Sequence, residues 1–595
     1  MHVTERCHSL NGSAAEAQHG AERRTAKRTY AAIVGIVLCV GVLLRFVALD
    51  QLPLPAHQDE LSDIYDGYCI AMTGADRAGD PWPIIIRGMG PGDYHPGLYA
   101  YLAGLSTRLL GLSVWAGRLP AVLAGSLTLL LVFFAAIETV GRRGALIALL
   151  FLVFSPVHIL YSRQAHAGAC LPPFFAALTL FLLLRSFRAI ECGGARSPFG
   201  WIFAAGLAIG TSTNAYGALR LSGVLFAIAA AALVTRQVGW RFGAWRRAVG
   251  LLTVLTLATL LGAAPQIYAA LGDSANFFAR AFTVVPSVGN GMRWWGERLM
   301  ANFAANLDPR HLYFSFGEHR LLTVARLSLV SLPFLYVGLA SALYRTVIRR
   351  HLPSALVLLT AVICLAPAVA SRPNPHPLRA SGVWAVYPIL SAIGAVAVSS
   401  ACVWLWRLRR IRARSDRPSL TMATERLSLL GASILGVAIT IFGFINVVRY
   451  LGHTEWHGPD AQYHLHSLAA WLDRHDDGFD RVYVDVPGLF PYLYFAFYSE
   501  MSPDEFRSAP REGMVTAHGW EQYQRFGKFY FANRFDADRD WSASDRKGRW
   551  LFLAAEGEVV EYGPTEKSSR YAKDGRRAHA ADVALLPRPH PTGSQ

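Results

Sequence analysis

Repeated apolar runs of about 20 residues constrain the fold of this chain most strongly. A helix of this length crosses the hydrocarbon core of a bilayer, which is about 30 Å thick. Eleven such runs are present, at residues 30–49, 119–137, 145–161, 171–187, 199–213, 221–235, 248–271, 322–344, 353–371, 380–406 and 427–449. Because 53% of the 595 residues are hydrophobic and only 16% are charged, the sequence predicts an all-α polytopic membrane protein.

Charge and cysteine content narrow the class further. Lys plus Arg (57) exceeds Asp plus Glu (41), and in a membrane protein this surplus is first a signal of orientation. We therefore expect membrane lipids, and no nucleic acid, as partners. The seven cysteines lack the spacing of a metal site or of a disulfide framework. The run after Lys27-Arg28 has no small-residue cleavage site, so we expect a retained first span.

The basic residues predict which face each loop occupies. A further run, 96–112, is shorter and carries Arg108, and we expect it to lie along the membrane surface without crossing. The basic clusters then share the cytoplasmic face. They lie at 23–28, 142–143, 185–196, 236–247, 345–350 and 407–417. The first loop, 50–118, and the C-terminal region are predicted to lie on the opposite face.

The chain divides into three parts, and its character changes after Tyr450. Residues 1–29 are predicted to be a cytoplasmic tail and 30–450 a transmembrane domain with interfacial helices. The polar residues 451–595 predict a small α/β domain outside the membrane, on the face of the first loop. Its expected elements are a helix at 462–475, strands at 481–486 and 549–553, and a disordered end from Pro587 to Gln595.

An acidic pair, Asp59-Glu60, directly follows the first span. Carboxylates beside hydrocarbon are costly and mark a functional site by default. One carboxylate can accept a proton from a hydroxyl while the other holds a cation or a neighbouring donor. The alternative is a solvated acidic loop. We favour a site, because the pair lies between a span and a segment rich in Tyr, His and Pro.

Other polar residues converge on the same predicted face. Those expected to bind substrate are His57, Tyr65, His95, Arg163, Arg220, Arg372 and Arg379. Carboxylates that face arginines suit transfer from a phosphorylated donor. Each candidate also has a structural alternative, since arginines at span ends usually extend to the interface and the prolines around Arg372 shape a rigid turn. We interpret His166 as a partner for a backbone carbonyl.

The order of several motifs resembles the GT-C membrane glycosyltransferases, in particular the dolichyl-phosphate-mannose–protein mannosyltransferases and the related bacterial aminoarabinose transferases. The motifs are Asp59-Glu60, Tyr94–Tyr101, Gly111–Pro120, Ser155–Gln164, Asn306–Glu318 and His376–Ala380. The resemblance extends from about residue 30 to about residue 400 and does not include the C-terminal region.

The resemblance implies an inverting transfer of a hexosyl or pentosyl group from a polyprenyl-phosphate donor. The acceptor would be a hydroxyl of a lipid, polysaccharide or protein, at the periplasmic face of a bacterial inner membrane. Asp59 matches the catalytic aspartate, Glu60 its acidic neighbour, and His95 a basic position near the donor phosphate. Many relatives carry an acidic residue five positions after the arginine that matches Arg163. Here that position is Gly168, which leaves a divalent metal open.

Two other functions remain compatible with the sequence. A transporter of lipid-linked envelope intermediates would also be polytopic and basic, but it should show internal repeats with broken helices, and none is visible. A non-catalytic scaffold of envelope assembly with this fold is the other alternative, and the retained Asp59-Glu60 pair argues against it. Whether Asp59 or Glu60 is the base stays open. We expect residues 451–595 to influence the choice of acceptor.

The topology is testable with reporter fusions. Alkaline phosphatase is active only outside the cytoplasm, so a fusion at the C-terminus should be active and a fusion at Arg412 inactive. Reporter activity at equal expression is the measurement. The reverse pattern would show that residues 96–112 cross the membrane.

Overall fold

The computed structural model describes most of the membrane part of the chain and, with gaps, its C-terminal region. The described residues are 4–53, 56–192, 198–238, 245–286, 289, 291–314, 326–412, 431, 434–449, 465, 468–469, 472, 479–485, 490–516, 519–531, 550–554, 559–562 and 569–571. The predicted disordered end and most of the predicted helix at 462–475 lie outside these residues.

Helices dominate the membrane part. They are α1 (Thr4–Phe46), α2 (Gln58–Thr73), α3 (Leu98–Leu110), α4 (Val114–Val153), α5 (Pro156–Tyr161), α6 (Ala167–Cys192), α7 (Pro198–Ser212), α8 (Gly217–Val238), α9 (Trp245–Gly272), α10 (Ser274–Val284), α11 (Gly291–Leu307), η2 (Arg310–Phe314), η3 (Leu329–Ser331), α12 (Leu332–Val347), α13 (Leu352–Val369), η4 (Ser381–Ala385) and α14 (Tyr387–Arg412). A further apolar helix spans Ile434–Arg449.

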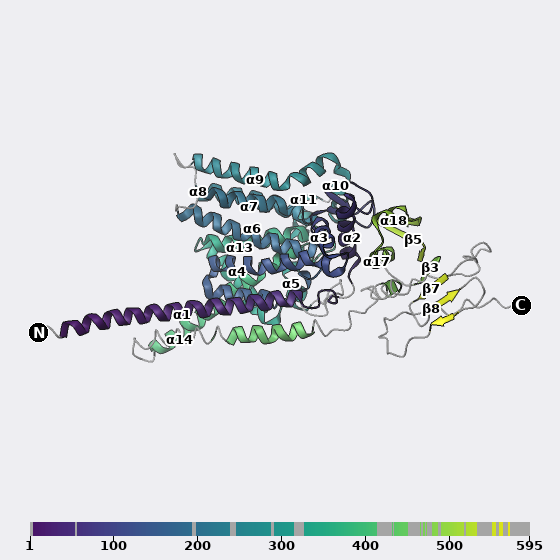
Figure 1. Cartoon of the computed structure of the whole chain (residues 1–595). Coiled ribbons are helices and arrows are strands. Elements are labelled where there is room, and N and C mark those ends of the chain that lie inside the picture. The colour runs from purple at the N-terminus through teal and green to yellow at the C-terminus, as the bar shows by residue number, and fades with distance from the viewer. Residues whose placement is uncertain are drawn as a thin grey trace.

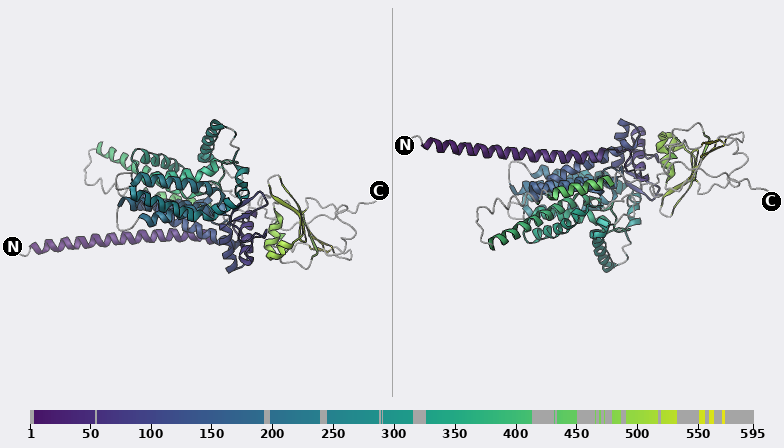
Figure 2. Two further views of the ribbon diagram at one scale, coloured as in Figure 1. Left: turned by 90° about the horizontal axis from the view of Figure 1, so that it is seen from above. Right: turned by 90° about the horizontal axis from the view of Figure 1, so that it is seen from below.

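In the described part of the chain, eight helices are long and apolar enough to cross a membrane: α1, α4, α6, α8, α9, α12, α13 and α14. The helices α7 and Ile434–Arg449 are apolar but shorter. They lie side by side with the long helices in Figure 1, and α1 extends beyond the bundle at its N-terminal end (Figure 2).

The long element α4 is two helices joined by a reversal at Gly141, whose φ of 76° favours glycine. Leu129 and Val153 both reach Gly41 of α1, where an added Cβ would lie 2.7 Å and 2.8 Å from their methyl carbons. In a straight helix these two residues would be about 36 Å apart. With α4 counted twice and the two shorter helices added, the eleven predicted runs are accounted for, which confirms the predicted all-α polytopic class.

Two short helices cover the end of the bundle that carries the acidic pair. α2 and α3 cross so closely that a Cβ on Gly67 would lie 2.2 Å from the carbonyl oxygen of Ala100. The 13 residues of α3 span only about 20 Å, less than the hydrocarbon core. The prediction that residues 96–112 do not cross the membrane agrees with this length. Figure 1 shows α2, α3 and α10 together at this end.

The C-terminal region forms a mixed sheet beside two short helices, α17 (Pro491–Tyr498) and α18 (Pro503–Ser508). The strand order is β4-β5-β6-β3-β7-β8-β9, with β3 parallel to β6 and β7. The strands are β3 (Arg481–Asp485), β4 (Arg511–Val515), β5 (Glu521–Phe526), β6 (Phe529–Phe531), β7 (Trp550–Ala554), β8 (Val559–Tyr562) and β9 (Ser569–Tyr571). Because β3 and β7 coincide with the two predicted strands, the small α/β part of the predicted fold is confirmed.

This region packs against the first loop, and the two share one hydrophobic cluster. Leu61 and Ile64 of α2 belong to the cluster together with Tyr494 and Phe506 from α17 and α18. The hydroxyl of Tyr494 also donates to the carbonyl oxygen of Ala56 (3.0 Å). Removal of the C-terminal region would therefore expose the apolar side of the helix that carries the acidic pair.

Candidate active site

His57 fixes the start of α2 and so the position of the acidic pair. Its extended backbone (φ −68°, ψ 153°) precedes the helix, and its Nδ1 accepts the backbone N–H of Asp59 (3.3 Å). The backbone N–H of His57 donates to the Glu60 carboxylate in return (3.2 Å). This reciprocal arrangement is a capping box. His57 was predicted to contact substrate, and the described hydrogen bonds give it a structural role as well.

Glu60 points into the protein and is only 1% exposed. Its carboxylate accepts two hydrogen bonds from the Arg118 guanidinium, from Nε at 2.9 Å and from Nη2 at 3.1 Å. It also accepts the backbone N–H of Ala165 (2.7 Å). Arg118 in turn donates to the carbonyl oxygens of Leu49 and Pro53. The pair therefore joins α2 to α4, to the turn before α6 and to the end of the first span.

Asp59, the residue before Glu60 on α2, points the other way, with 42% of its side chain exposed. Burial would raise the pKa of its carboxyl group, but three neighbouring histidines outweigh burial and lower that pKa. They are His57, His166 and His95. The Asp59 carboxylate lies 3.5 Å from Nδ1 of His57 and 3.5 Å from Nε2 of His166. Asp59 is thus accessible and stays ionised.

His166 is a site residue that our interpretation of the sequence missed. Its Nδ1 accepts the backbone N–H of Gly168 (3.0 Å), which leaves Nε2 to carry the proton that faces Asp59. In the sequence, a single histidine before a transmembrane helix gives no indication that it will contact Asp59. Asp63, one turn after Asp59 on α2, accepts the backbone N–H of Ala167 at the start of α6 (3.3 Å) and lies 3.8 Å from His95.

Tyr216 lies close to His166 and to charged groups of both signs. Its ring meets that of His166 edge-on, with centroids 6.3 Å apart. Burial raises the pKa of Tyr216, and the nearby Arg379 and Arg280 lower it. Asp59 and Asp93, also close by, add to the increase. The tyrosine thus lies near groups of both signs.

Tyr216 also explains the glycine at position 168. A Cβ on Gly168 would lie 2.8 Å from ring atoms of Tyr216, a distance that real Cβ atoms do not reach. A carboxylate-bearing residue at 168 would therefore require Tyr216 to move. The side chain of Tyr216 takes the space that the acidic residue would need.

Two arginines supply positive charge near Tyr216. Arg379 follows the proline-rich turn, and its guanidinium is held by the Ser371 hydroxyl (3.0 Å) and the Arg372 carbonyl oxygen (2.6 Å). Arg280 extends from α10, with Nε 3.9 Å from Asp93. Arg280 was not among the predicted residues, because it lies in a long loop without a motif. Arg372 itself is exposed, and its backbone N–H donates to Val284.

Three predicted binding residues have structural contacts instead. Arg163 donates to the carbonyl oxygens of Leu44, Ala48 and Leu52 and so closes the end of α1. Tyr65 is buried and donates to the carbonyl oxygen of Met501 (2.7 Å). Arg220 donates to Gln266 (3.0 Å) and to the carbonyl oxygen of Phe277 (2.6 Å). These contacts lend no support to their predicted contact with substrate.

A metal site was left open by the sequence. Within the residues that the structure describes, no group of three or more His, Cys, Asp or Glu side chains is arranged to hold a metal ion. The space at Gly168, where relatives place a further carboxylate, is taken by Tyr216. The described side chains therefore do not fit a resident metal.

Comparison with known proteins agrees with this architecture. Residues 94–268 match the model of the family described as dolichyl-phosphate-mannose–protein mannosyltransferase. The predicted resemblance to these mannosyltransferases is confirmed. The chain is also similar to ArnT from Cupriavidus metallidurans bound to undecaprenyl phosphate, with a TM-score of 0.52, 16% identity, and coverage of 88% of this chain and 93% of that one. For ArnT from the same organism in the apo state, the TM-score is 0.50 and the identity 17%, and the match covers 79% of this chain and 84% of ArnT.

No curated protein matches the sequence. The segment that matches the mannosyltransferase family includes His95, Arg163, Tyr216 and Arg220. Asp59 precedes this segment. The similarity to ArnT extends over most of the chain and shows that the chain has a GT-C fold.

The two acidic neighbours are expected to respond differently to substitution. Glu60→Gln leaves the buried Arg118 charge without its counterion, so the free energy of unfolding should fall by about 3–5 kcal/mol. The thermal unfolding temperature of the purified protein in detergent is the measurement. The control is Glu297→Gln, which breaks an exposed pair with Arg293 and should change little. If Glu60→Gln unfolds at the wild-type temperature, the pair does not support α2.

Proposed function

We propose that this protein is an inverting glycosyltransferase that uses a polyprenyl-phosphate sugar as its donor. The acceptor would be a hydroxyl of a lipid, polysaccharide or protein, at the periplasmic face of a bacterial inner membrane. The mannosyltransferase match and the GT-C fold support the reaction class. ArnT has been crystallised with undecaprenyl phosphate, which supports a lipid-linked donor here.

The observation that carries the proposal is the difference between the two acidic neighbours, since Glu60 is buried and Asp59 is partly exposed. The buried Glu60 carboxylate already accepts hydrogen bonds from Arg118 and from the backbone of Ala165, so it is not available to a substrate. Asp59 is exposed, ionised and surrounded by histidines. Asp59 is therefore the residue of the pair that we assign as the general base, a point that the sequence left open.

In the proposed reaction the acceptor oxygen attacks the anomeric carbon of the sugar. The bond from that carbon to the phosphate oxygen breaks, and the leaving polyprenyl phosphate keeps the electron pair. The acceptor proton passes to Asp59. Its pKa is low in the open site, but burial acts to raise it. A bound donor that covers the exposed part of Asp59 would therefore strengthen it as a base.

The leaving phosphate requires positive charge. Arg379 and Arg280 lie near Tyr216, and His95 lies beside Asp63. We assign these three side chains to the donor phosphate. Charged donors hold a phosphate through strong hydrogen bonds, and they compensate the charge that builds up as the bond to the sugar breaks.

The acceptor would approach Asp59 from the side of the site on which the C-terminal region lies. The backbone N–H of Glu521 donates to the carbonyl oxygen of Met89 (2.7 Å), and that of Gly92 donates to the carbonyl oxygen of Gly519 (3.1 Å). The loop between Met89 and Gly92 precedes Asp93, which lies beside Arg280. These contacts support a role of the C-terminal region in the choice of acceptor.

The catalytic assignment is tested by Asp59→Asn. This change keeps the size of the side chain but removes the charge that accepts the proton. Turnover should fall by about 10²–10⁴-fold, the usual contribution of a general base, while donor binding persists. The measurement is the initial rate of polyprenyl phosphate release in the presence of acceptor.

The control for this experiment is Asp50→Asn, the same substitution at an exposed position just after the first span. It should keep the wild-type rate. A loss of only a few-fold in Asp59→Asn, at matched expression and with donor bound, would falsify the proposed mechanism.

The pH dependence of transfer provides a separate test. The base must be ionised, so at low donor concentration, where the rate reports the free enzyme, activity is lost as pH falls through the folded-state pKa of Asp59, below the ordinary aspartate value of about 3.9. His166→Ala removes a hydrogen bond and a positive charge that lower this pKa. The acidic limb of the rate profile should therefore move to higher pH.

The matched control is His351→Ala, which removes a histidine that caps α13 at the other end of the bundle. Its acidic limb should coincide with that of the wild type. If His166→Ala leaves the limb in place, His166 does not act on Asp59.

A further inference from the structure

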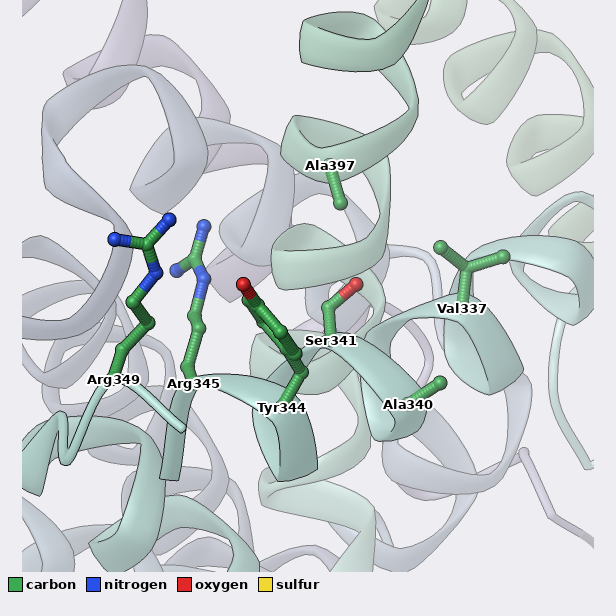
Figure 3. Close-up of a pocket in the computed structure, with 7 residues that line it drawn as sticks. All are labelled: Val337, Ala340, Ser341, Tyr344, Arg345, Arg349 and Ala397. Carbon is green, nitrogen blue, oxygen red and sulfur yellow. The ribbon is translucent and has the colours of Figure 1, made fainter. Parts of the chain in front are cut away.

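A second site lies between α12 and α14, away from the catalytic residues. A cavity of about 500 Å³ opens there. Its apolar part is lined by Val337, Ala340 and Ala397. Its polar part is lined by Ser341, Tyr344 and two arginines, Arg345 and Arg349. Figure 3 shows the arginines and Tyr344 at one end of the cavity, with Ala397 facing them from α14.

The cavity exists because the two helices meet closely at one point and then separate. A Cβ on Gly338 would lie 1.9 Å from the carbonyl oxygen of Leu390, and one on Gly394 would lie 1.9 Å from that of Phe334. Ser341 and Ala397 each follow their glycine by one helical turn. The small side chains at this level do not fill the widening gap.

The polar end carries two positive charges one helical turn apart. Arg345 lies in the last turn of α12 and Arg349 just beyond it. Within the described residues, neither guanidinium lies within ion-pair distance of a carboxylate. Arg349 also lies over the ring of Tyr344, 6.0 Å from its centroid. The two charges are thus available to an anion.

The side of α12 beside the cavity faces lipid. Leu343, Tyr344, Val347 and Ile348 are exposed large apolar residues on a helix long and apolar enough to cross a membrane. In a bilayer such a surface contacts acyl chains. An apolar cavity that opens on this surface would therefore be filled by an acyl chain. The two arginines would determine which lipid headgroup accompanies that acyl chain.

The cavity lies at the end of the bundle opposite the active site. α6 begins beside Asp63, one turn after Asp59, and ends at Cys192, next to Glu191. Burial and Arg345 lower the pKa of His351, and Glu191 opposes them, so the end of α12 is close to the end of α6. This is the face on which the basic clusters are predicted to lie.

We propose that this cavity binds one anionic phospholipid, with the headgroup phosphate on Arg345 and Arg349 and an acyl chain along Val337, Ala340 and Ala397. Basic pockets between transmembrane helices on the cytoplasmic side bind anionic headgroups in this way. The contribution of each arginine near the membrane surface corresponds to about fivefold in affinity. The site would therefore prefer phosphatidylglycerol over phosphatidylcholine.

The test is native mass spectrometry of the purified full-length protein in detergent, titrated with phosphatidylglycerol or with phosphatidylcholine of the same chains. The wild type should bind phosphatidylglycerol more tightly. The double variant Arg345→Gln/Arg349→Gln should lose about thirtyfold in affinity for phosphatidylglycerol and, with it, the preference over phosphatidylcholine. The matched control is Arg236→Gln, in the last turn of α8, which should behave as the wild type.

A second variant tests the chain-binding part without a change of charge. Ala397→Phe fills the apolar end and should weaken both lipids. The proposal is overturned if the wild type binds the two lipids equally, if the double arginine variant keeps the preference, or if Ala397→Phe binds both lipids as the wild type does.

Discussion

The buried pair between Glu60 and Arg118 is the interaction on which the candidate site depends. It brings together the end of the first span, the start of α2, the helix α4 and the turn before α6. A charge buried at this depth is tolerated only when it is paired and hydrogen-bonded, and both conditions are met. Because α2 is held from its inner side, the next carboxylate, Asp59, faces outward and needs no structural partner of its own. Glu60 is held by buried contacts, and its neighbour Asp59 stays accessible.

The first loop and the C-terminal region act as one structural unit although more than 300 residues separate them in the sequence. Their shared cluster covers the outer side of α2, while α3 and α4 cover its other sides. α2 is therefore packed by the C-terminal region on one side and by α3 and α4 on others, while the side chain of Asp59 stays partly exposed. The C-terminal region thus completes the packing of the helix that carries the acidic pair.

The sequence predicted the fold well because span length and apolar composition are local properties. All eleven apolar runs correspond to helices, and the run at 96–112 was separated from them by its shorter length, by Arg108 and by the positions of the basic clusters. The acidic pair was found for the same reason, since it directly follows a span. The choice between Asp59 and Glu60 was not predictable, because it depends on Arg118, 58 residues further along. The contact of Arg163 with a phosphate stays a prediction, and the hydrogen bonds that the structure gives it go to backbone carbonyl oxygens at the end of α1. His166, Tyr216 and Arg280 are brought together only by the tertiary structure.

The contact between Gly168 and Tyr216 has a consequence for the history of the family. The two side chains compete for one volume, so an acidic residue at 168 fits only where the ring at 216 turns aside or is replaced by a smaller side chain. We therefore expect the residue types at these two positions to vary together among homologous chains, with a small residue at 168 accompanying an aromatic ring at 216.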